Sequence, residues 1–432
     1  MWKHRISFKP ALLSRTSPTR TLSNSTHFYQ NRQVELYAAK ETNRLTLRQL
    51  IFFGRSIDEE KLLKSANYVR TEIPVRLAHR LRDLQALPYV VVTQEGVTKV
   101  YELYCSAFEK SFRRYPPITN LEENETFCHF LSNILNEHST VIPSLTLGLS
   151  LGSPFVPPDE LDAFVRRMLV SRISRRVLAE HHIALSESFS GKSGTTSRPH
   201  VGIIQTGLNV RESIEKCADL LRHRSTDLEQ QDHNLEGRPW PEVVVDGHLD
   251  TEFPYIPAHL EYIVFELLKN AIRATVTNHA SEKSFPAIQA TIAAGKDEVG
   301  IRISDRGGGI RALESQIQTP SDLFSFSHVR NAARMEGSRI GALRTISSSE
   351  QGMWATVGEQ VNRWLQHDNG ADNPEPEPVV SLHTSTGIGL PMSNVYATYF
   401  GGSLELIPLD GWGTDVYVRL PKLGTNLEGI EV

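Results

Sequence analysis

The sequence predicts an α + α/β protein, in which an antiparallel helical bundle is followed by an α/β sandwich. Residues 35–226 repeat apolar side chains mainly at helical spacing. From about residue 240 onward, strand-like and helical segments alternate, as in a sheet covered by helices. Three glycine-containing motifs also lie in this second part of the chain. We therefore expect a helical domain over residues 35–226 and a sandwich domain over residues 227–432.

The composition argues against two classes of partner. The formal net charge of the 432 residues is −4, so we expect neither a nucleic acid nor an anionic membrane surface as a partner. No apolar run approaches the roughly 18 residues that a membrane-spanning helix needs, so we expect no membrane span. The cysteines Cys105, Cys128 and Cys217 lie far apart, and we expect ordinary thiols in a reducing compartment.

Residues 1–34 form a separate segment by composition. They contain six Lys and Arg, nine Ser and Thr, and no acidic residue. Basic, Ser-rich, acid-poor segments are typical of transit peptides. We therefore expect import into mitochondria, the alternative being a disordered tail.

The helical half contains several long stretches with apolar residues on one face. Two stripes are well defined, one from Phe127 to Ile142 and one from Leu161 to Ala179, and stretches 58–88, 96–115 and 203–224 have similar spacing. Proline and Gly-Ser clusters separate these stretches. The pattern favours an antiparallel bundle of about five helices.

Three basic side chains fall on the apolar stripes of two neighbouring helices in this bundle, namely His138, Arg172 and Arg176. Buried cations require partners, and two arginines one turn apart beside a histidine suit a small carboxylate. The alternative is that acidic side chains of the protein itself satisfy them.

The stretch 257–277 organises the second half. Pro257 suits the first turn of a helix, and apolar residues follow at helical spacing. Glu266, Asn270 and Arg273 stand at positions i, i+4 and i+7, so they share another face. Taken alone, this face also fits an ordinary solvated exterior.

Strand patterns follow that helix. They include AIQATIAAG, EVGIRISD, SLELIPL and DVYVRLP, and the last two straddle an Asp-Gly turn that predicts a hairpin. Glycine motifs accompany them in ISDRGGGI (Ile303–Ile310), TGIGLP (Thr386–Pro391) and GWGTDVYVRL (Gly411–Leu420). We expect a mixed sheet with helices on one face.

A helix with Glu and Asn, a strand ending in Asp-x-Gly-x-Gly, then Gly-x-Gly, then Gly-Thr in a hairpin resembles the Bergerat-type ATPases, which include gyrase and the histidine kinases. The segments ELLKNAIRAT, ISDRGGGI and GIGLP resemble the mitochondrial 2-oxoacid dehydrogenase kinases in particular. NEHSTVIPSL and SRISRRVLAEHHIAL resemble the helical domain of the same kinases. The resemblance runs from about Phe28 to Leu420.

The resemblance implies a site for ATP and Mg²⁺, with K⁺ as a further ion. Asn270 would offer a neutral carbonyl oxygen to Mg²⁺, which prefers oxygen ligands. Asp305 would accept a hydrogen bond from the adenine amine, and Thr414 would bond the same edge of the base. Gly307 and Gly309 would allow the backbone to approach the base and sugar.

The phosphates would lie at the start of a helical segment over 390–399, whose first N–H groups can receive anionic oxygens. The residues concerned are Thr386, Gly387, Ile388, Gly389 and Leu390. Lys269 and Arg273 would add positive charge near the phosphates, or else face solvent.

Glu266 is the candidate general base, because it could accept or orient the proton of an attacking hydroxyl. Phosphoryl transfer otherwise needs mainly positioning and charge neutralisation. Kinases of the pyruvate branch have a histidine one turn before this Glu. Tyr262 stands there in this chain, as in the branched-chain kinase, so a His–Glu dyad does not carry over.

Residues 312–386 should contain a lid over ATP. The segment is polar and longer than a compact lid, with an insert near residues 340–370. Ser385 stands where the family's glycine box often begins with Gly. A rival motif, Gly307-x-Gly309-x-x-Ala312, matches the dinucleotide fingerprint but lacks a βαβ unit and a later acidic residue.

These observations lead to a functional expectation. We expect a mitochondrial matrix protein-serine kinase that phosphorylates the E1α subunit of a 2-oxoacid dehydrogenase complex and inactivates it. The branched-chain complex is favoured because of Tyr262, with a pyruvate dehydrogenase kinase as the alternative and an inactive nucleotide-binding scaffold as a further one. The resemblance also implies docking on the E2 lipoyl domain, a homodimer, and regulation by small keto-acid-like molecules at His138, Arg172 and Arg176.

Overall fold

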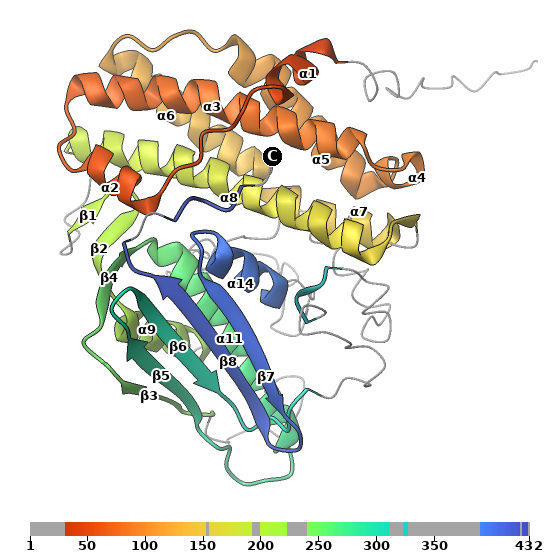
Figure 1. Ribbon diagram of the computed structural model, residues 1–432, viewed down its shortest axis with the longest axis vertical. Helices are drawn as coiled ribbons and strands as arrows, with labels where there is room; N and C mark the ends of the chain where they lie inside the picture. The colour runs from red at the N-terminus through yellow and green to blue at the C-terminus, as the bar shows by residue number, and fades with distance from the viewer. Residues whose placement is uncertain are drawn as a thin grey trace, which may run out of the picture.

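The computed structural model describes residues 31–152, 155–191, 199–222, 240–310, 323–326, 389–423 and 426–430. Most of the predicted transit segment and of the predicted lid lies outside these ranges. Within them, the chain forms a helical part above a sheet-containing part in the view of Figure 1. No helix among the described residues is both long and apolar enough to cross a membrane.

The helical part begins at residue 32. Its α-helices are α1 (Arg32–Ala38), α2 (Leu47–Gly54), α3 (Glu59–Gln85), α4 (Tyr89–Val92), α5 (Glu95–Ser106), α6 (Leu121–Glu137), α7 (Val141–Gly152) and α8 (Pro158–Phe189). Local chemistry sets several starts, because the side chains of Asn31, Thr46, Asp58 and Asn120 each accept a backbone N–H of the helix that follows.

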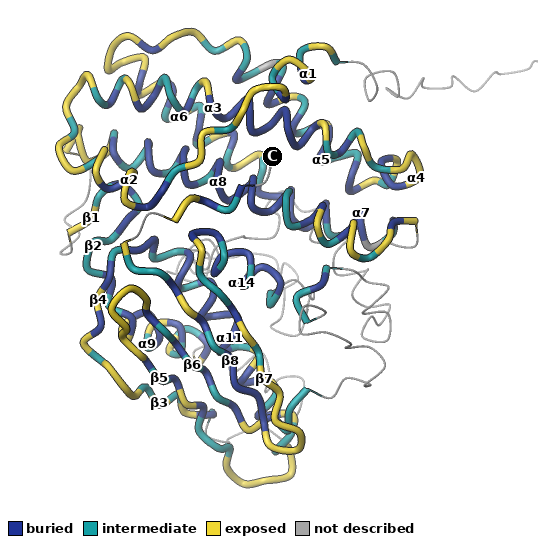
Figure 2. Tube along the Cα trace, in the orientation of Figure 1, coloured by how far each residue is buried: buried dark blue, intermediate teal, exposed yellow. Residues whose placement is uncertain are grey.

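The two longest helices, α3 and α8, pack against each other and form the centre of the bundle. Both contribute many buried side chains, and Figure 2 shows α8 buried along most of its length. The predicted apolar stripes over 127–142 and 161–179 therefore face the core. A second contact, between α5 and α7, is made through glycine: a Cβ at Gly96 would overlap the carbonyl oxygen of Ser144.

The second part is the predicted α/β sandwich. Its main sheet has the order β3-β5-β6-β8-β7, with β3 parallel to β5 and the other pairs antiparallel. The strands are β3 (Val243–Gly247), β5 (Ile288–Ala294), β6 (Glu298–Ser304), β7 (Ser403–Leu409) and β8 (Gly413–Pro421). The helices α9 (Val210–Arg222), α11 (Pro257–Asn278) and α14 (Gly389–Thr398) cover one face of this sheet.

The prediction of helix for one stretch was partly wrong. Residues 203–224 contain the strand β2 (Ile204–Asn209) before α9. β2 joins β1 (His200–Val201) and β4 (Glu252–Tyr255) in a small antiparallel sheet, and α9 packs against α11. The segment from residue 200 thus packs with the residues that follow it. The division at residue 226 stays a prediction about domains, but it does not coincide with this packing.

The segment 426–430 connects the two parts. It returns to the helical bundle, where the end of the chain is marked in Figure 1. The carboxylate of Glu428 accepts hydrogen bonds from Arg76 of α3 (2.7 and 3.2 Å), the Leu45 amide (3.0 Å) and the Tyr399 hydroxyl (2.6 Å). Tyr399 directly follows α14, so one carboxylate joins the bundle to the sandwich.

Candidate functional site

Helix α11 places the predicted general base beside the start of α14. The helix begins with Pro257 at its first position, and Glu266 in its middle is only 5% exposed. The Lys269 ammonium lies 2.6 Å from Glu266 and neutralises it. A Cβ at Gly389 would overlap Glu266 Oε2. Glycine at this motif position leaves the Glu266 carboxylate its place beside the start of α14.

Asn270 and Arg273 lie on the same helix but are exposed. The predicted shared face therefore runs from a buried carboxylate to exposed polar groups. An exposed carboxamide one turn beyond Glu266 can reach a metal ion held by phosphate oxygens, since Mg²⁺ combines protein oxygens with phosphate and water. This arrangement fits the predicted metal role of Asn270 without testing it.

The other end of the site is a turn after β6. Asp305 is buried, and its Oδ1 accepts the amides of Gly307 (2.7 Å) and Thr414 (3.1 Å). Burial raises the pKa of Asp305, and the two amide hydrogen bonds oppose the rise. The pairing of β6 with β8 thus brings Asp305 and Thr414 together, although they are far apart in the sequence.

Glycine at 307 and 309 is needed for different reasons. A Cβ at Gly307 would overlap Ala274 of α11, so the turn can pack on the helix only with glycine. Gly309 has a φ of 81°, which most side chains disfavour. The predicted residues Thr386, Gly387 and Ile388 lie outside the described ranges, whereas Gly389 and Leu390 form the first turn of α14.

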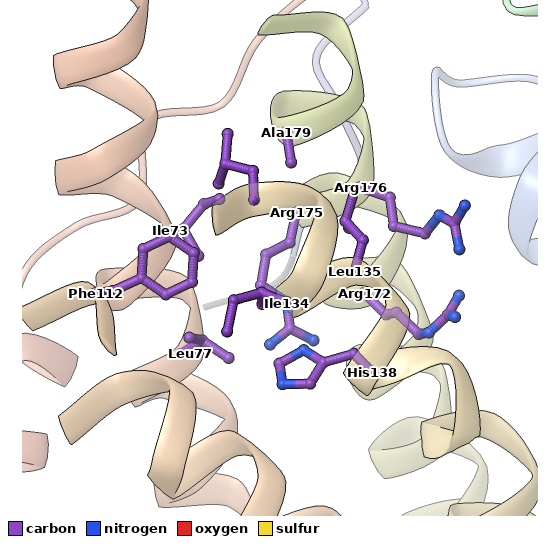
Figure 3. Close-up of a pocket in the computed structure, with 11 residues that line it drawn as sticks. Ile73, Leu77, Phe112, Ile134, Leu135, His138, Arg172, Arg175, Arg176 and Ala179 are labelled. Carbon is purple, nitrogen blue, oxygen red and sulfur yellow. The ribbon is translucent and has the colours of Figure 1, made fainter. Parts of the chain in front are cut away.

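A cavity in the helical bundle contains the second predicted cluster. Figure 3 shows His138, Arg172 and Arg176 among its lining residues, with Arg175 beside them. The apolar lining comes from α3, α6, α8 and the turn after α5: Ile73, Leu77, Phe112, Leu131, Ile134, Leu135 and Ala179. The three basic residues named from the sequence thus line one cavity, together with a fourth, Arg175, that the sequence did not indicate.

The cavity carries a positive charge. Burial, with the charges of Arg175 and Arg172, lowers the pKa of His138 to about 3, so its imidazole is neutral. Arg176 pairs with Glu180 at 2.5 Å. Arg175 bonds the Tyr104 hydroxyl (2.7 Å) and the Ser171 carbonyl (3.2 Å), while its buried Nη1 has no hydrogen-bond partner among the described residues. Such a cavity favours an anion over a neutral or cationic molecule.

Two other sequence features are structural in these surroundings: a segment that resembles the catalytic loop of eukaryotic protein kinases, and a histidine pair that a histidine kinase could use as phosphoacceptor. HRLRD (His79–Asp83) lies within α3, where Arg80 pairs with Asp83 at 3.1 Å. His181 and His182 lie inside the bundle, 4% and 0% exposed. Buried imidazoles are not accessible to a phosphoryl donor, which argues against a histidine-phosphorylating kinase.

Comparisons with known proteins agree with this geometry. Residues 44–205 match the family described as mitochondrial branched-chain alpha-ketoacid dehydrogenase kinase. Residues 255–424 match the family described as histidine kinase-, DNA gyrase B-, and HSP90-like ATPase. The two matched ranges correspond to the helical part and to most of the sandwich.

Whole-chain relatives are pyruvate dehydrogenase kinases by name. The mitochondrial [pyruvate dehydrogenase (acetyl-transferring)] kinase of Arabidopsis thaliana is 30% identical over 389 residues, covering 89% of this chain and 92% of the relative. Kinase 2 of Saccharomyces cerevisiae is 28% identical (95% and 88% covered), and kinase isozyme 1 of Rattus norvegicus is 29% identical (91% and 80% covered). With its Bergerat-type ATPase fold and these relatives, the chain belongs to the family of mitochondrial 2-oxoacid dehydrogenase kinases and is a protein kinase.

Proposed function

We propose that this kinase transfers the γ-phosphate of ATP to a serine of the E1α subunit of the pyruvate dehydrogenase complex. The transfer would take place in the mitochondrial matrix and would inactivate the complex. The names of the whole-chain relatives support this substrate. The sequence favoured the branched-chain complex, and the comparisons support the alternative instead.

The branched-chain complex remains the second candidate on one observation. Tyr262 is buried one turn before Glu266 and lies against Tyr396 of α14, with ring centroids 4.8 Å apart. This tyrosine occupies the position at which the pyruvate branch was expected to have histidine. The description of the family that matches residues 44–205 also names the branched-chain kinase.

The main support for an ATP site is the distance along α11 between two contacts. The turn 305–309 packs on Ala274, and the start of α14 packs on Glu266. Eight residues of α-helix separate these contacts by about 12 Å. A nucleoside triphosphate lying along α11 would therefore have its base at Asp305 and Thr414 and its phosphates at the start of α14.

In this arrangement each residue has one chemical role. The substrate hydroxyl oxygen forms a bond to the γ-phosphorus, the bond from phosphorus to the bridging oxygen breaks, and Glu266 accepts the hydroxyl proton. Lys269 holds the Glu266 carboxylate in place. Asn270 would hold Mg²⁺, which neutralises the phosphate oxygens, and K⁺ is the further ion that the resemblance implied.

Transfer of radiolabelled phosphate from ATP tests the proposal. Purified pyruvate and branched-chain E1 would be compared as acceptors, for wild type and Glu266→Gln. We expect pyruvate E1α to be labelled faster, and the variant to lose about 10²- to 10⁴-fold in rate. Glu261→Gln on the same helix, where Glu261 pairs with Lys216, is the control. If Glu266→Gln labels E1α as fast as wild type does, Glu266 is not the general base. If the branched-chain E1α is labelled faster than pyruvate E1α, the proposed substrate is wrong.

We further propose that the cationic cavity binds a small keto acid as a regulator. Hydrogen-bond donors for a carboxylate and a keto oxygen come from the neutral imidazole of His138 and from the guanidinium groups of Arg172, Arg175 and Arg176. The apolar lining suits a short side chain. Calorimetry with pyruvate and a branched 2-oxoacid should show binding to wild type and its loss in an Arg172→Ala, Arg176→Ala protein. Arg211→Ala, on the exposed side of α9, should bind as wild type does. Unchanged affinity in the double variant would contradict this site.

Docking on an E2 lipoyl domain and formation of a homodimer complete the proposal. Both rest on the family resemblance. Sedimentation of the purified kinase, alone and with an isolated lipoyl domain, would test them together.

A further inference from the structure

The turn that carries Asp305 rests on the C-terminal end of α11. His279 directly follows that helix, and its Nε2 lies 2.9 Å from the carbonyl oxygen of Arg306. The other ring nitrogen, Nδ1, lies 2.7 Å from the carboxylate of Glu282. Asn278 also approaches the Arg306 carbonyl, at 3.3 Å. The wall of the base site is therefore held from behind by the end of α11.

The two acceptors favour the charged form of the ring, and the Asn278 amide nitrogen lies farther from Nε2, at 3.4 Å. A carbonyl oxygen and a carboxylate can only accept hydrogen bonds, and neutral imidazole carries a single N–H. Both contacts are satisfied at once only by the imidazolium form. The hydrogen bond to Glu282 raises the pKa of His279, and partial burial and the nearby Arg306 guanidinium oppose the rise. Glu282, from the turn after α11, and Arg306, from the base-site turn, are the charged groups that face the ring.

The same turn is held from the opposite side by the β7–β8 hairpin. The Gly308 amide donates to the Trp412 carbonyl (3.2 Å), and the Arg306 guanidinium lies over the Trp412 ring at 5.1 Å. The backbone between Asp305 and Gly309 is thus fixed between the hairpin and His279. Loss of one of these two supports would let the turn shift relative to Thr414.

We propose that protonated His279 is a positioning residue of the nucleotide site, and that it makes ATP affinity fall as the pH rises. The residue acts through the backbone at Arg306 and does not itself touch the nucleotide. The inference rests on the proposed function, in which the turn 305–309 forms the wall facing the base.

The direction of the pH effect follows from the raised pKa. The imidazolium contacts are fully present below the ordinary pKa of histidine, about 6.5. They are lost as the pH rises through the higher folded-state pKa of His279. One ring N–H then remains for two acceptors, and one contact is given up.

The test measures ATP dissociation constants by calorimetry over the histidine range, roughly pH 5.5 to 8.5. For wild type we expect the dissociation constant of ATP to rise about two- to tenfold from the lowest to the highest pH, which corresponds to the loss of one net hydrogen bond. His279→Gln should bind with nearly the same weak affinity at every pH. Glu282→Gln should keep the tight affinity at low pH but shift the midpoint of the rise to lower pH, because the carboxylate that stabilises the imidazolium is gone.

A matched control is His248→Gln. The Nδ1 of His248 accepts the Ala294 amide at 3.2 Å, so this exposed histidine does not need to be protonated for that contact. Its variant should reproduce the wild-type profile. A purely structural role for His279 would not predict a displaced midpoint in Glu282→Gln.

Three outcomes would overturn the inference. They are a wild-type affinity that does not change with pH, identical midpoints for wild type and Glu282→Gln, and an unchanged pH dependence in His279→Gln. Absence of ATP binding to wild type at any pH would instead refute the proposed nucleotide site, and the inference with it. An NMR titration of the His279 ring in the nucleotide-free protein tests the pairing with Glu282 without ATP. A titration midpoint that is the same in wild type and Glu282→Gln would also refute the inference.

Discussion

Among the residues that the structure describes, burial keeps His138, His181, His182 and His259 in the neutral form. Burial is the main cause, and it lowers the pKa of His138 and His259 to about 3 and that of His181 and His182 to about 4. In the unfolded chain each would titrate near the ordinary value, about 6.5. The unfolded state therefore binds more protons than the folded state below that pH.

This difference predicts a loss of stability in acid. The free energy of unfolding should fall as the pH drops from about 6.5 toward 4, because unfolding then takes up protons at these histidines. Urea denaturation at several pH values measures the slope. His182→Gln, whose amide can replace the contact with Ser65, should show a shallower slope, whereas exposed His129→Gln should not. Equal slopes in all three proteins would contradict the prediction.

The positions of single residues were predictable from the sequence where a motif placed them at the end of a strand. Asp305 and Thr414 lie together because β6 pairs with β8, with Ser304 opposite Asp415. Arg175 was missed because it stands between two stripe positions on α8, and the width of a buried helix's inner face is set by its neighbours. His279 had no motif, since its role depends on a carbonyl 27 positions away.

The crossing of α5 and α7 depends on small residues. Gly96 faces the backbone of α7 at Ser144 and Gly148, and Gly148 faces the backbone of α5 at Val97. Backbone atoms cannot move aside as a side chain can. The two helices therefore approach this closely only while both positions lack a Cβ.

Gly96→Ala should destabilise the helical part by about 1–3 kcal/mol, the usual cost of overpacking, despite the better helix propensity of alanine. Chemical denaturation followed by circular dichroism measures the change. Gly300→Ala in β6 is the control, because its Cβ would meet neighbours at ordinary distances of 3.6 Å and more. A Gly96→Ala protein as stable as wild type would show that the helices can separate without cost.

Long elements were easier to predict than short ones. The helices α3, α6, α8 and α11 follow the apolar periodicity of their sequences, because each presents several turns to the core. The small sheet of β1, β2 and β4 was missed. Six residues or fewer give too few repeats to distinguish strand from helix, and pairing with β4 decides the conformation of β2.

At the scale of the whole molecule, the two parts are joined by a buried ion pair. Arg76 is 1% and Glu428 2% exposed, and Arg76 also pairs with Glu72 at 3.0 Å. A buried charge that loses its partner is strongly unfavourable. The sequence could not indicate this contact, because its partners are 352 positions apart.

Glu428→Ala should lower the free energy of unfolding by about 3 kcal/mol, the lower end of the cost of breaking a buried pair, because Glu72 still faces Arg76. The helical part and the sandwich should then unfold in more separate transitions. Glu405→Ala, which removes an exposed ion pair with Arg419 at 3.7 Å, should change stability by less than about 0.5 kcal/mol. Similar effects of the two substitutions would contradict a joining role for Glu428.

The position of Glu428 also has a consequence for synthesis on the ribosome. Arg76 and the Leu45 amide are made more than 350 residues before the carboxylate that satisfies them. Until then the Arg76 guanidinium of the nascent bundle has Glu72 as its acidic partner. Completion of the bundle must therefore wait for the synthesis of Glu428, and contacts of such long sequence separation form slowly. A chaperone that bound the unfinished bundle during translation would keep Arg76 from other acidic partners until Glu428 is made.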